Sequence, residues 1–147
     1  MKKEKILINS KEIVLDMEVA EGCTVLADSF YLEQAIKNYL GNAVSHTKPG
    51  GTVAVRLYIE NNNAVFSVYN DGERIPEQKL GKIWDSFYKT NEARTRDEGN
   101  NIGLGLYIVK TIISSHAGEY GVNNLDGGVE FYFTLPLAGG RSYDEKN

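Results

Sequence analysis

The sequence contains a single cysteine, Cys23, among its 147 residues. One cysteine cannot form an internal disulfide or a cysteine-based zinc site, and a chain of this kind fits a reducing compartment. We interpret Cys23 as a small apolar side chain that fills space in the interior.

Long apolar runs and an excess of basic residues are also missing. No stretch approaches the ~18 consecutive apolar residues of a membrane-spanning helix, and the start Met1-Lys2-Lys3 lacks the apolar region of a leader peptide. We therefore expect a soluble, cytoplasmic chain without direct membrane contact. The net charge of −4 disfavours nucleic acid as a partner, because proteins that bind it are usually basic.

The length and the apolar patterning predict one α+β domain over residues 1–137, followed by a polar, disordered tail at 138–147. The expected architecture is a two-layer α/β sandwich, in which helices cover one face of a mixed, mainly antiparallel sheet. Strands are predicted at 6–8, 13–19, 24–26, 52–60, 64–69 and 129–135. Helices are predicted from residue 28 or 29 to Pro49, at 76–81 and at 103–116.

The long predicted helix carries the most informative pattern in the chain. Asn38 and Asn42 stand four residues apart beside its apolar stripe, and so share one face. Amides in that position need partners. Either a bound metal or phosphate provides them, or the two asparagines bond to a neighbouring loop.

Three later segments decide between these alternatives when they are read with this helix. They are Val68-Tyr-Asn-Asp-Gly-Glu-Arg-Ile-Pro76, Ile83-Trp-Asp-Ser-Phe-Tyr-Lys89 and Ile102-Gly-Leu-Gly-Leu-Tyr-Ile-Val-Lys110. In this order the four segments resemble the N, G1, F and G2 boxes of the ATP-binding catalytic domain of sensor histidine kinases. The resemblance covers roughly residues 4–137 and implies the Bergerat-type nucleotide-binding fold of gyrase, Hsp90-type chaperones and mismatch-repair ATPases, with ATP and Mg²⁺ as cofactors.

The resemblance implies that Asn42 is the Mg²⁺ ligand and that Asn38 lies beside the metal and the phosphates. Gyrase, the chaperones and the anti-sigma serine kinases carry a glutamate general base at the position of Asn38. An asparagine cannot accept a proton, so the site suits transfer of the γ-phosphoryl group rather than hydrolysis.

The G1-like segment implies the adenine contacts. Asn70 aligns with the family aspartate, Gly72 is the close-approach glycine and Ile75 is a wall of the base pocket; a one-residue slip would give the base contact to Asp71 instead. An asparagine at this position has a donor as well as an acceptor, and a free amide would discriminate ATP from GTP loosely. His46 aligns with an aromatic position that stacks on adenine.

Residues 89–101 are polar and predict a mobile lid over the nucleotide. Lys89 is the implied contact of the γ-phosphate, with Arg94 or Arg96 assisting. Gly103, Leu104, Gly105 and Leu106 open the next helix, where free N–H groups favour a phosphate.

The aromatic residues before the lid, Trp84, Phe87 and Tyr88, are interpreted with Ile83 as core anchors. Asn100-Asn101-Ile102 replaces the usual Gly-Gly-Thr, and Ser45 replaces a lysine. Both departures weaken the expected binding of ATP.

Neither His46 nor His116 lies in the phosphoacceptor motif of this family. The resemblance therefore implies a catalytic domain separated from a larger, membrane-anchored sensor, inactive alone. The implied partners are the helical dimerisation and histidine phosphotransfer domain of the parent kinase and, indirectly, a response regulator. A degenerate regulatory nucleotide-binding module and an anti-sigma-type protein serine kinase are the alternatives.

Overall fold

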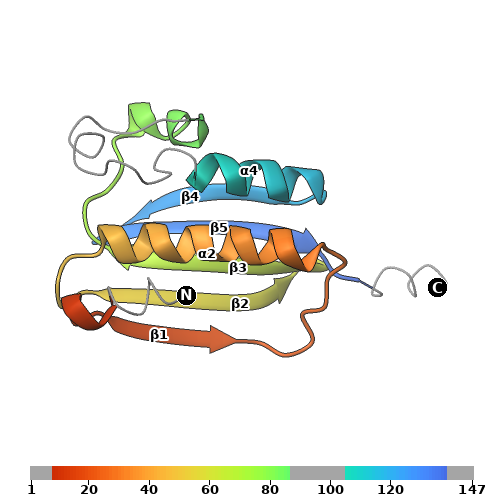
Figure 1. Ribbon diagram of the computed structural model, residues 1–147, viewed down its shortest axis with the longest axis horizontal. Coiled ribbons are helices and arrows are strands. Elements are labelled where there is room, and N and C mark those ends of the chain that lie inside the picture. Colours follow the sequence, from red (N-terminus) through yellow and green to blue (C-terminus); the bar gives the residue numbers. More distant parts are fainter. Residues whose placement is uncertain (1–7, 87–104, 139–147) are drawn as a thin grey trace.

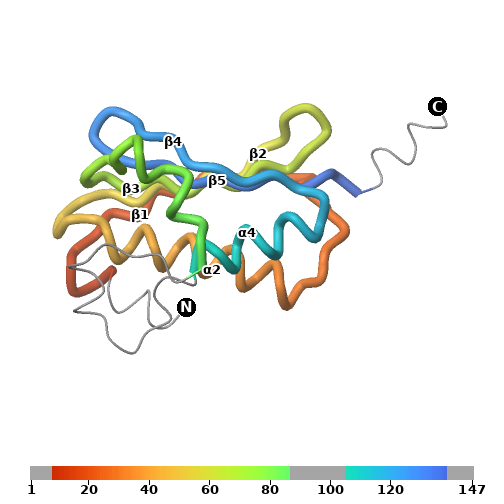
Figure 2. The backbone as a smooth tube through the Cα atoms, turned by 90° about the horizontal axis from the view of Figure 1, so that it is seen from above, coloured from red at the N-terminus to blue at the C-terminus, as the bar shows by residue number. Residues whose placement is uncertain are grey.

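The computed structural model describes residues 8–86 and 105–138, and its architecture confirms the predicted α+β sandwich. Five strands form one sheet in the order β1-β2-β3-β5-β4. β1 pairs with β2 in parallel, and the other three pairings are antiparallel. Helices α2 and α4 both lie on one face of the sheet (Figures 1 and 2). The strands are β1 (Val14–Val19), β2 (Thr52–Glu60), β3 (Asn63–Asp71), β4 (Glu119–Leu125) and β5 (Gly128–Pro136), and the helices are α2 (Ser29–His46) and α4 (Gly105–Ser115).

The helix α2 begins and ends where its sequence directs. The side chain of Asp28 caps it by accepting hydrogen bonds from the N–H groups of Phe30 and Tyr31. The helix ends at His46, three residues before Pro49. None of the described helices is long and apolar enough to cross a lipid bilayer.

Tyr39 anchors α2 to the sheet. Its ring packs against Phe131 and Phe133, with centroids 5.5 and 5.7 Å away, and its hydroxyl donates to the carbonyl of Tyr132 at 2.8 Å. Burial raises the pKa of the Tyr39 hydroxyl, so the group stays a protonated donor. This contact fixes the middle of the helix that carries Asn38 and Asn42.

The turn between β2 and β3 also follows from local sequence. Asn61 and Asn62 have φ angles of 54° and 66°, the left-handed conformation that a two-residue hairpin loop requires and that asparagine tolerates. The predicted hairpin is therefore confirmed.

Several sequence-based predictions of local structure were wrong. Ile8, expected to end a strand, lies in a helical turn, and the segment 24–26 makes only a single bridge, from Val25 to Leu137. The helix expected at 76–81 is a short 3-10 helix, Glu77–Lys79, and a second 3-10 helix, Lys82–Trp84, follows it. The strand β4 was missed, because the glycine and the two asparagines that it contains are typical of loops. In the folded chain, pairing with β5 overrides that preference.

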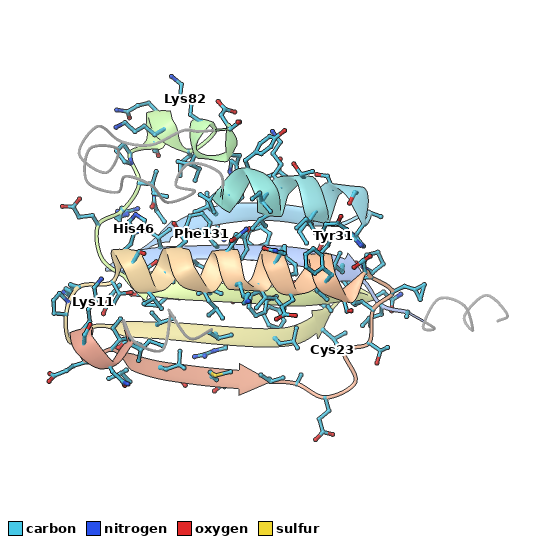
Figure 3. All side chains as sticks on the ribbon, viewed as in Figure 1. Lys11, Cys23, Tyr31, His46, Lys82 and Phe131 are labelled. Carbon is cyan, nitrogen blue, oxygen red and sulfur yellow. The ribbon has the colours of Figure 1, made fainter. Side chains whose placement is uncertain are left out.

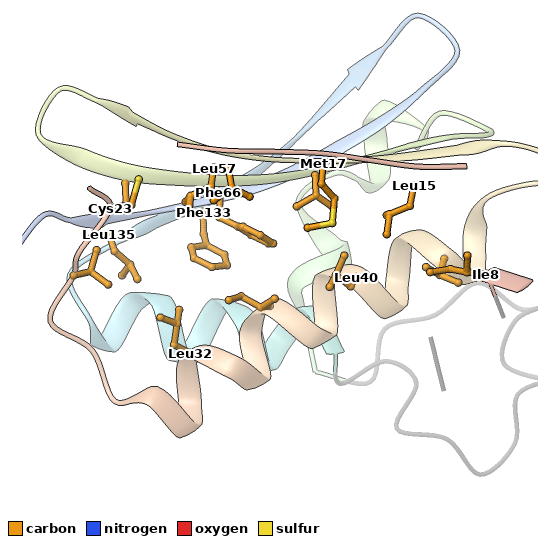
Figure 4. A pocket seen from close by; sticks show the side chains of 16 residues that line it. Ile8, Leu15, Met17, Cys23, Leu32, Leu40, Leu57, Phe66, Phe133 and Leu135 are labelled. Carbon is orange, nitrogen blue, oxygen red and sulfur yellow. The ribbon is translucent and has the colours of Figure 1, made fainter. Parts of the chain in front are cut away.

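A hollow of about 270 Å³ lies between α2 and the sheet, and its lining is almost entirely apolar (Figure 4). Leu15 and Met17 of β1 face Leu40 of α2 across it. It includes no candidate site residue, and apolar walls cannot bind a triphosphate. A triphosphate site therefore belongs on the polar side of α2, away from this hollow.

Candidate nucleotide-binding site

The candidate site lies at one end of the sheet. α2 and α4 run in opposite directions, so the last turns of α2 and the first turn of α4 point to the same end, where β3 also ends (Figure 1). The structure thus brings the helix of Asn38 and Asn42 to the same end as the segment of Asn70, Gly72 and Ile75.

Asn38 carries an unsatisfied hydrogen-bond donor. Its Nδ2 atom is buried, and within residues 8–86 and 105–138 it has no hydrogen-bond partner. A buried donor of this kind costs about 1–3 kcal/mol. The proposed bond from Asn38 to a neighbouring loop is therefore absent from the described structure, and an acceptor such as a phosphate oxygen would satisfy the group. Asn42 lies one turn later on the same face, half-buried, and its amide oxygen suits Mg²⁺.

Asn70 and Asp71 point to opposite faces of the sheet. Strand alternation puts Asn70 on the face of Phe66 and Val68, which belong to the core under the helices. Asn70 is only 3% exposed, and its Nδ2 donates to the carbonyl of Asp71 at 3.0 Å. This bond fixes which side of the amide carries the acceptor Oδ1.

The carboxylate of Asp71 holds the start of β2. Its Oδ2 accepts the N–H of Thr52 at 3.0 Å, and a Cβ at Gly51 would lie only 2.3 Å from its Oδ1. Oδ1 is buried and has no partner in the described part of the chain. Because Asp71 is turned toward β2, the geometry favours Asn70 as the base contact.

Gly72 is required by the close approach of β3 to α2. Its φ of +148° disfavours other residues, and a Cβ there would lie 3.1 Å from the carbonyl oxygen of His46. His46 itself is exposed, and its Nδ1 donates to the carbonyl of Asn42 at 2.8 Å. The imidazole is thus held against the last turn of α2, whose backbone Gly72 approaches.

Asn124 holds one of the candidate site residues, Ile75, and sequence reasoning missed it. From β4, its Oδ1 accepts the N–H of Ile75 at 2.9 Å and its Nδ2 donates to the carbonyl of Ile75 at 2.8 Å. The amide thus acts as a backbone group would in a sheet, and it fixes the half-buried Ile75. No sequence signal distinguished Asn124 from a loop asparagine, because β4 was not foreseen.

The predicted phosphate contacts are described only in part. Gly105 and Leu106 form the first turn of α4, and a Cβ at Gly105 would meet no heavy atom within 4 Å. Lys89, Gly103 and Leu104 lie outside the described residues.

Of the remaining predicted lid and anchor residues, some lie within the described part of the chain and others lie outside it. Arg94, Arg96, Phe87 and Tyr88 fall beyond the described ranges, as does the predicted tail from residue 139 onward. Trp84 is buried against Tyr120 and Phe131, with centroids 4.6 and 5.9 Å away. Its interpretation as a core anchor is confirmed.

The locked amide of Asn70 changes the expected nucleotide preference. Flipping it would turn Oδ1 toward the carbonyl oxygen of Asp71, placing two acceptors against each other, so the loose discrimination expected from sequence is no longer expected. We predict that GTP binds about tenfold more weakly than ATP, because the guanine carbonyl would meet an acceptor. Competition of each nucleotide against a fluorescent ATP analogue measures the ratio. Asn70→Ala should bring it near one, and Asp71→Asn should leave it unchanged; a collapse in Asp71→Asn instead would assign the contact to Asp71.

Comparison with known proteins agrees with this geometry. The family model described as "Histidine kinase-, DNA gyrase B-, and HSP90-like ATPase" matches residues 27–139. The sensor protein CzcS of Cupriavidus metallidurans is 33% identical over 135 residues, which cover 91% of this chain and 28% of CzcS. The chain thus spans little more than a quarter of that relative.

Solved structures are similar over nearly the whole chain. The catalytic domain of the histidine kinase ThkA in a nucleotide-free form has a TM-score of 0.78 and 29% identity, covering 92% of this chain and 89% of that domain. ThkA in complex with the response regulator protein TrrA has a TM-score of 0.74 and 26% identity, covering 93% of this chain and 39% of ThkA.

Proposed function

This chain belongs to the histidine kinase-, DNA gyrase B- and HSP90-like ATPase family, and it is the ATP-binding catalytic domain of a sensor histidine kinase. We propose that it binds Mg²⁺-ATP at the C-terminal end of α2 and delivers the γ-phosphoryl group to a histidine of a dimerisation domain. The buried Nδ2 of Asn38, which has no partner among the residues that the structure describes, is the observation that carries the proposal. It is a donor placed one turn before Asn42, and a phosphate oxygen is the acceptor it lacks.

The residues fit the cofactor. Asn42 offers an amide oxygen to Mg²⁺, which takes few protein ligands and, when bound with ATP, neutralises charge on the phosphates. Asn38 holds a phosphate oxygen with its N–H. The proposed phosphate contacts are completed by Lys89, by Gly103 and Leu104, and by the first turn of α4 at Gly105 and Leu106.

At the other end of the proposed site, Asn70 accepts from the amino group of adenine. Gly72 and Ile75 form walls of the base pocket, and His46 stacks on the ring. Support comes from two separate contacts: Asn70 donates to the carbonyl of Asp71, and Asn124 makes two bonds to the backbone of Ile75. Groups fixed before the nucleotide arrives reduce the ordering cost of binding.

Asn38 determines the kind of reaction. Hydrolysis needs a base that takes a proton from water, and a carboxamide cannot take it. The domain therefore holds ATP intact until a nucleophile arrives. This favours a histidine kinase over an ATPase or an anti-sigma-type serine kinase.

The whole parent protein is proposed to be a membrane-anchored sensor in two-component signalling. The acceptor histidine belongs to its helical dimerisation domain, and a response regulator is the indirect partner. Support comes from ThkA, a similar histidine kinase whose structure is described in complex with the response regulator TrrA.

We predict that the isolated chain binds ATP but neither autophosphorylates nor turns it over above a trace rate. Radiolabelled ATP is incubated with the chain alone and with a histidine-bearing dimerisation domain of a sensor kinase fused before residue 1. Label should appear only in the fusion and should be lost when its acceptor histidine is replaced by glutamine. Multiple-turnover hydrolysis by the chain alone would contradict the proposal.

A further inference from the structure

Lys11 lies just before β1, and its ammonium group meets the end of α2 (Figure 3). The Nζ atom donates to the carbonyl oxygens of Val44 and Ser45 at 3.0 Å each and to that of Thr47 at 2.9 Å. An ammonium has three N–H donors. All three are therefore used on one helix terminus.

This contact completes the capping of α2. The last carbonyls of a helix have no partners within it and carry partial negative charge, which a cation stabilises. The carbonyl of Ala43 is satisfied within the turn, by the N–H of Thr47 at 3.0 Å and its hydroxyl at 2.7 Å. Lys11 then supplies donors to the next carbonyls, those of Val44 and Ser45.

The backbone of Lys11 is held as well. Its carbonyl accepts the N–H of Gly50 at 2.7 Å, from the turn that follows α2. Ile13 is buried, and its N–H bonds to the carbonyl of Ile8. The ammonium thus projects from a fixed base, and the end of α2 is tied to the segment that leads into β1.

We propose that Lys11 is a positioning residue for nucleotide binding, which fixes the last turn of α2 and through it His46 and Asn42. The inference rests on the proposed function. His46 lies between the carbonyls that Lys11 binds, and its own carbonyl oxygen is the atom that a Cβ at Gly72 would approach to 3.1 Å. A shift of this turn therefore moves the imidazole and changes the spacing to Gly72 and Asn70, at the base end of the site.

The test measures Mg²⁺-ATP affinity of Lys11→Met with a fluorescent ATP analogue, at a temperature where all variants are folded. We expect affinity to fall about tenfold, which corresponds to about 1.4 kcal/mol. Lys82→Met controls for loss of an exposed lysine, since Lys82 lies in a 3-10 helix outside the α2 cap. Val65→Ala controls for lost stability, since Val65 is buried in β3. Both controls should bind as wild type does.

A second readout separates positioning from stability. The chain has two histidines, so an NMR spectrum of the imidazole Cε1–H groups contains two signals, one for each histidine. In Lys11→Met the His46 signal should shift and that of His116 should stay; Lys11→Arg, which keeps several donors, should restore part of the affinity.

The outcomes are distinct. Wild type that fails to bind Mg²⁺-ATP would overturn the proposed function and this inference with it. The inference alone would be overturned if wild type binds and Lys11→Met binds equally well. It would also be overturned if Lys11→Met loses no more affinity than Val65→Ala when the two variants are equally stable. A tenfold loss with a selective His46 shift supports it.

Discussion

Replacing Asn42 by alanine is expected to abolish the magnesium-dependent stabilisation of this domain by ATP. A ligand at a hundredfold its dissociation constant stabilises the folded state by about 2.7 kcal/mol, which corresponds to a rise of about 8 °C in Tm for a chain of this size. Without the amide oxygen of Asn42 the metal has no protein ligand at this position of α2. The metal-dependent part of the shift should then disappear, because it depends on binding of Mg²⁺ with ATP to the folded state.

Thermal unfolding with ATP alone, with Mg²⁺ alone and with both is the measurement. Gln34→Ala is the matched control, because Gln34 lies on the same helix two turns before Asn42 and is also half-buried. It should retain the full Mg²⁺-ATP shift. An unchanged magnesium-dependent shift in Asn42→Ala would show that Asn42 does not bind the metal.

Asn38→Ala is expected to make the ligand-free domain more stable while it weakens ATP binding about thirtyfold. The substitution removes a buried donor that has no partner in the described structure and places a better helix former in α2. Together these effects should raise the free energy of unfolding by about 1 kcal/mol. The same donor is proposed to bond a phosphate oxygen, and a hydrogen bond to a charged group contributes about 1.5–3 kcal/mol.

Denaturant unfolding without nucleotide and titration with the fluorescent ATP analogue measure the two effects. Gln34→Ala again serves as the control, since it also replaces a half-buried amide of α2 by alanine. Opposite signs for stability and affinity in Asn38→Ala are the diagnostic result. A ligand-free domain that is destabilised, together with unchanged ATP affinity, would mean that Asn38 is a packing residue.

Much of the site-bearing helix was determined by the sequence itself. Asp28 caps the start of α2, and the spacing of Asn38 and Asn42 places both on one face, because each of these two features depends on residues within one or two helical turns. The hairpin turn at Asn61 and Asn62 is local in the same sense. The four ordered motifs then identified the family, which no single motif could have done.

Tertiary structure alone decided which groups hold the site in place. Lys11 caps the end of α2 across 33 to 36 residues of sequence, and Asn124 fixes Ile75 across 49 residues. Neither contact has a local pattern, because a lysine before a strand and an asparagine in a glycine-containing segment are compatible with any exposed loop. The choice between Asn70 and Asp71 was open for the same reason: adjacent strand residues face opposite sides of a sheet, and only the packing of α2 and α4 determines which side is the interior.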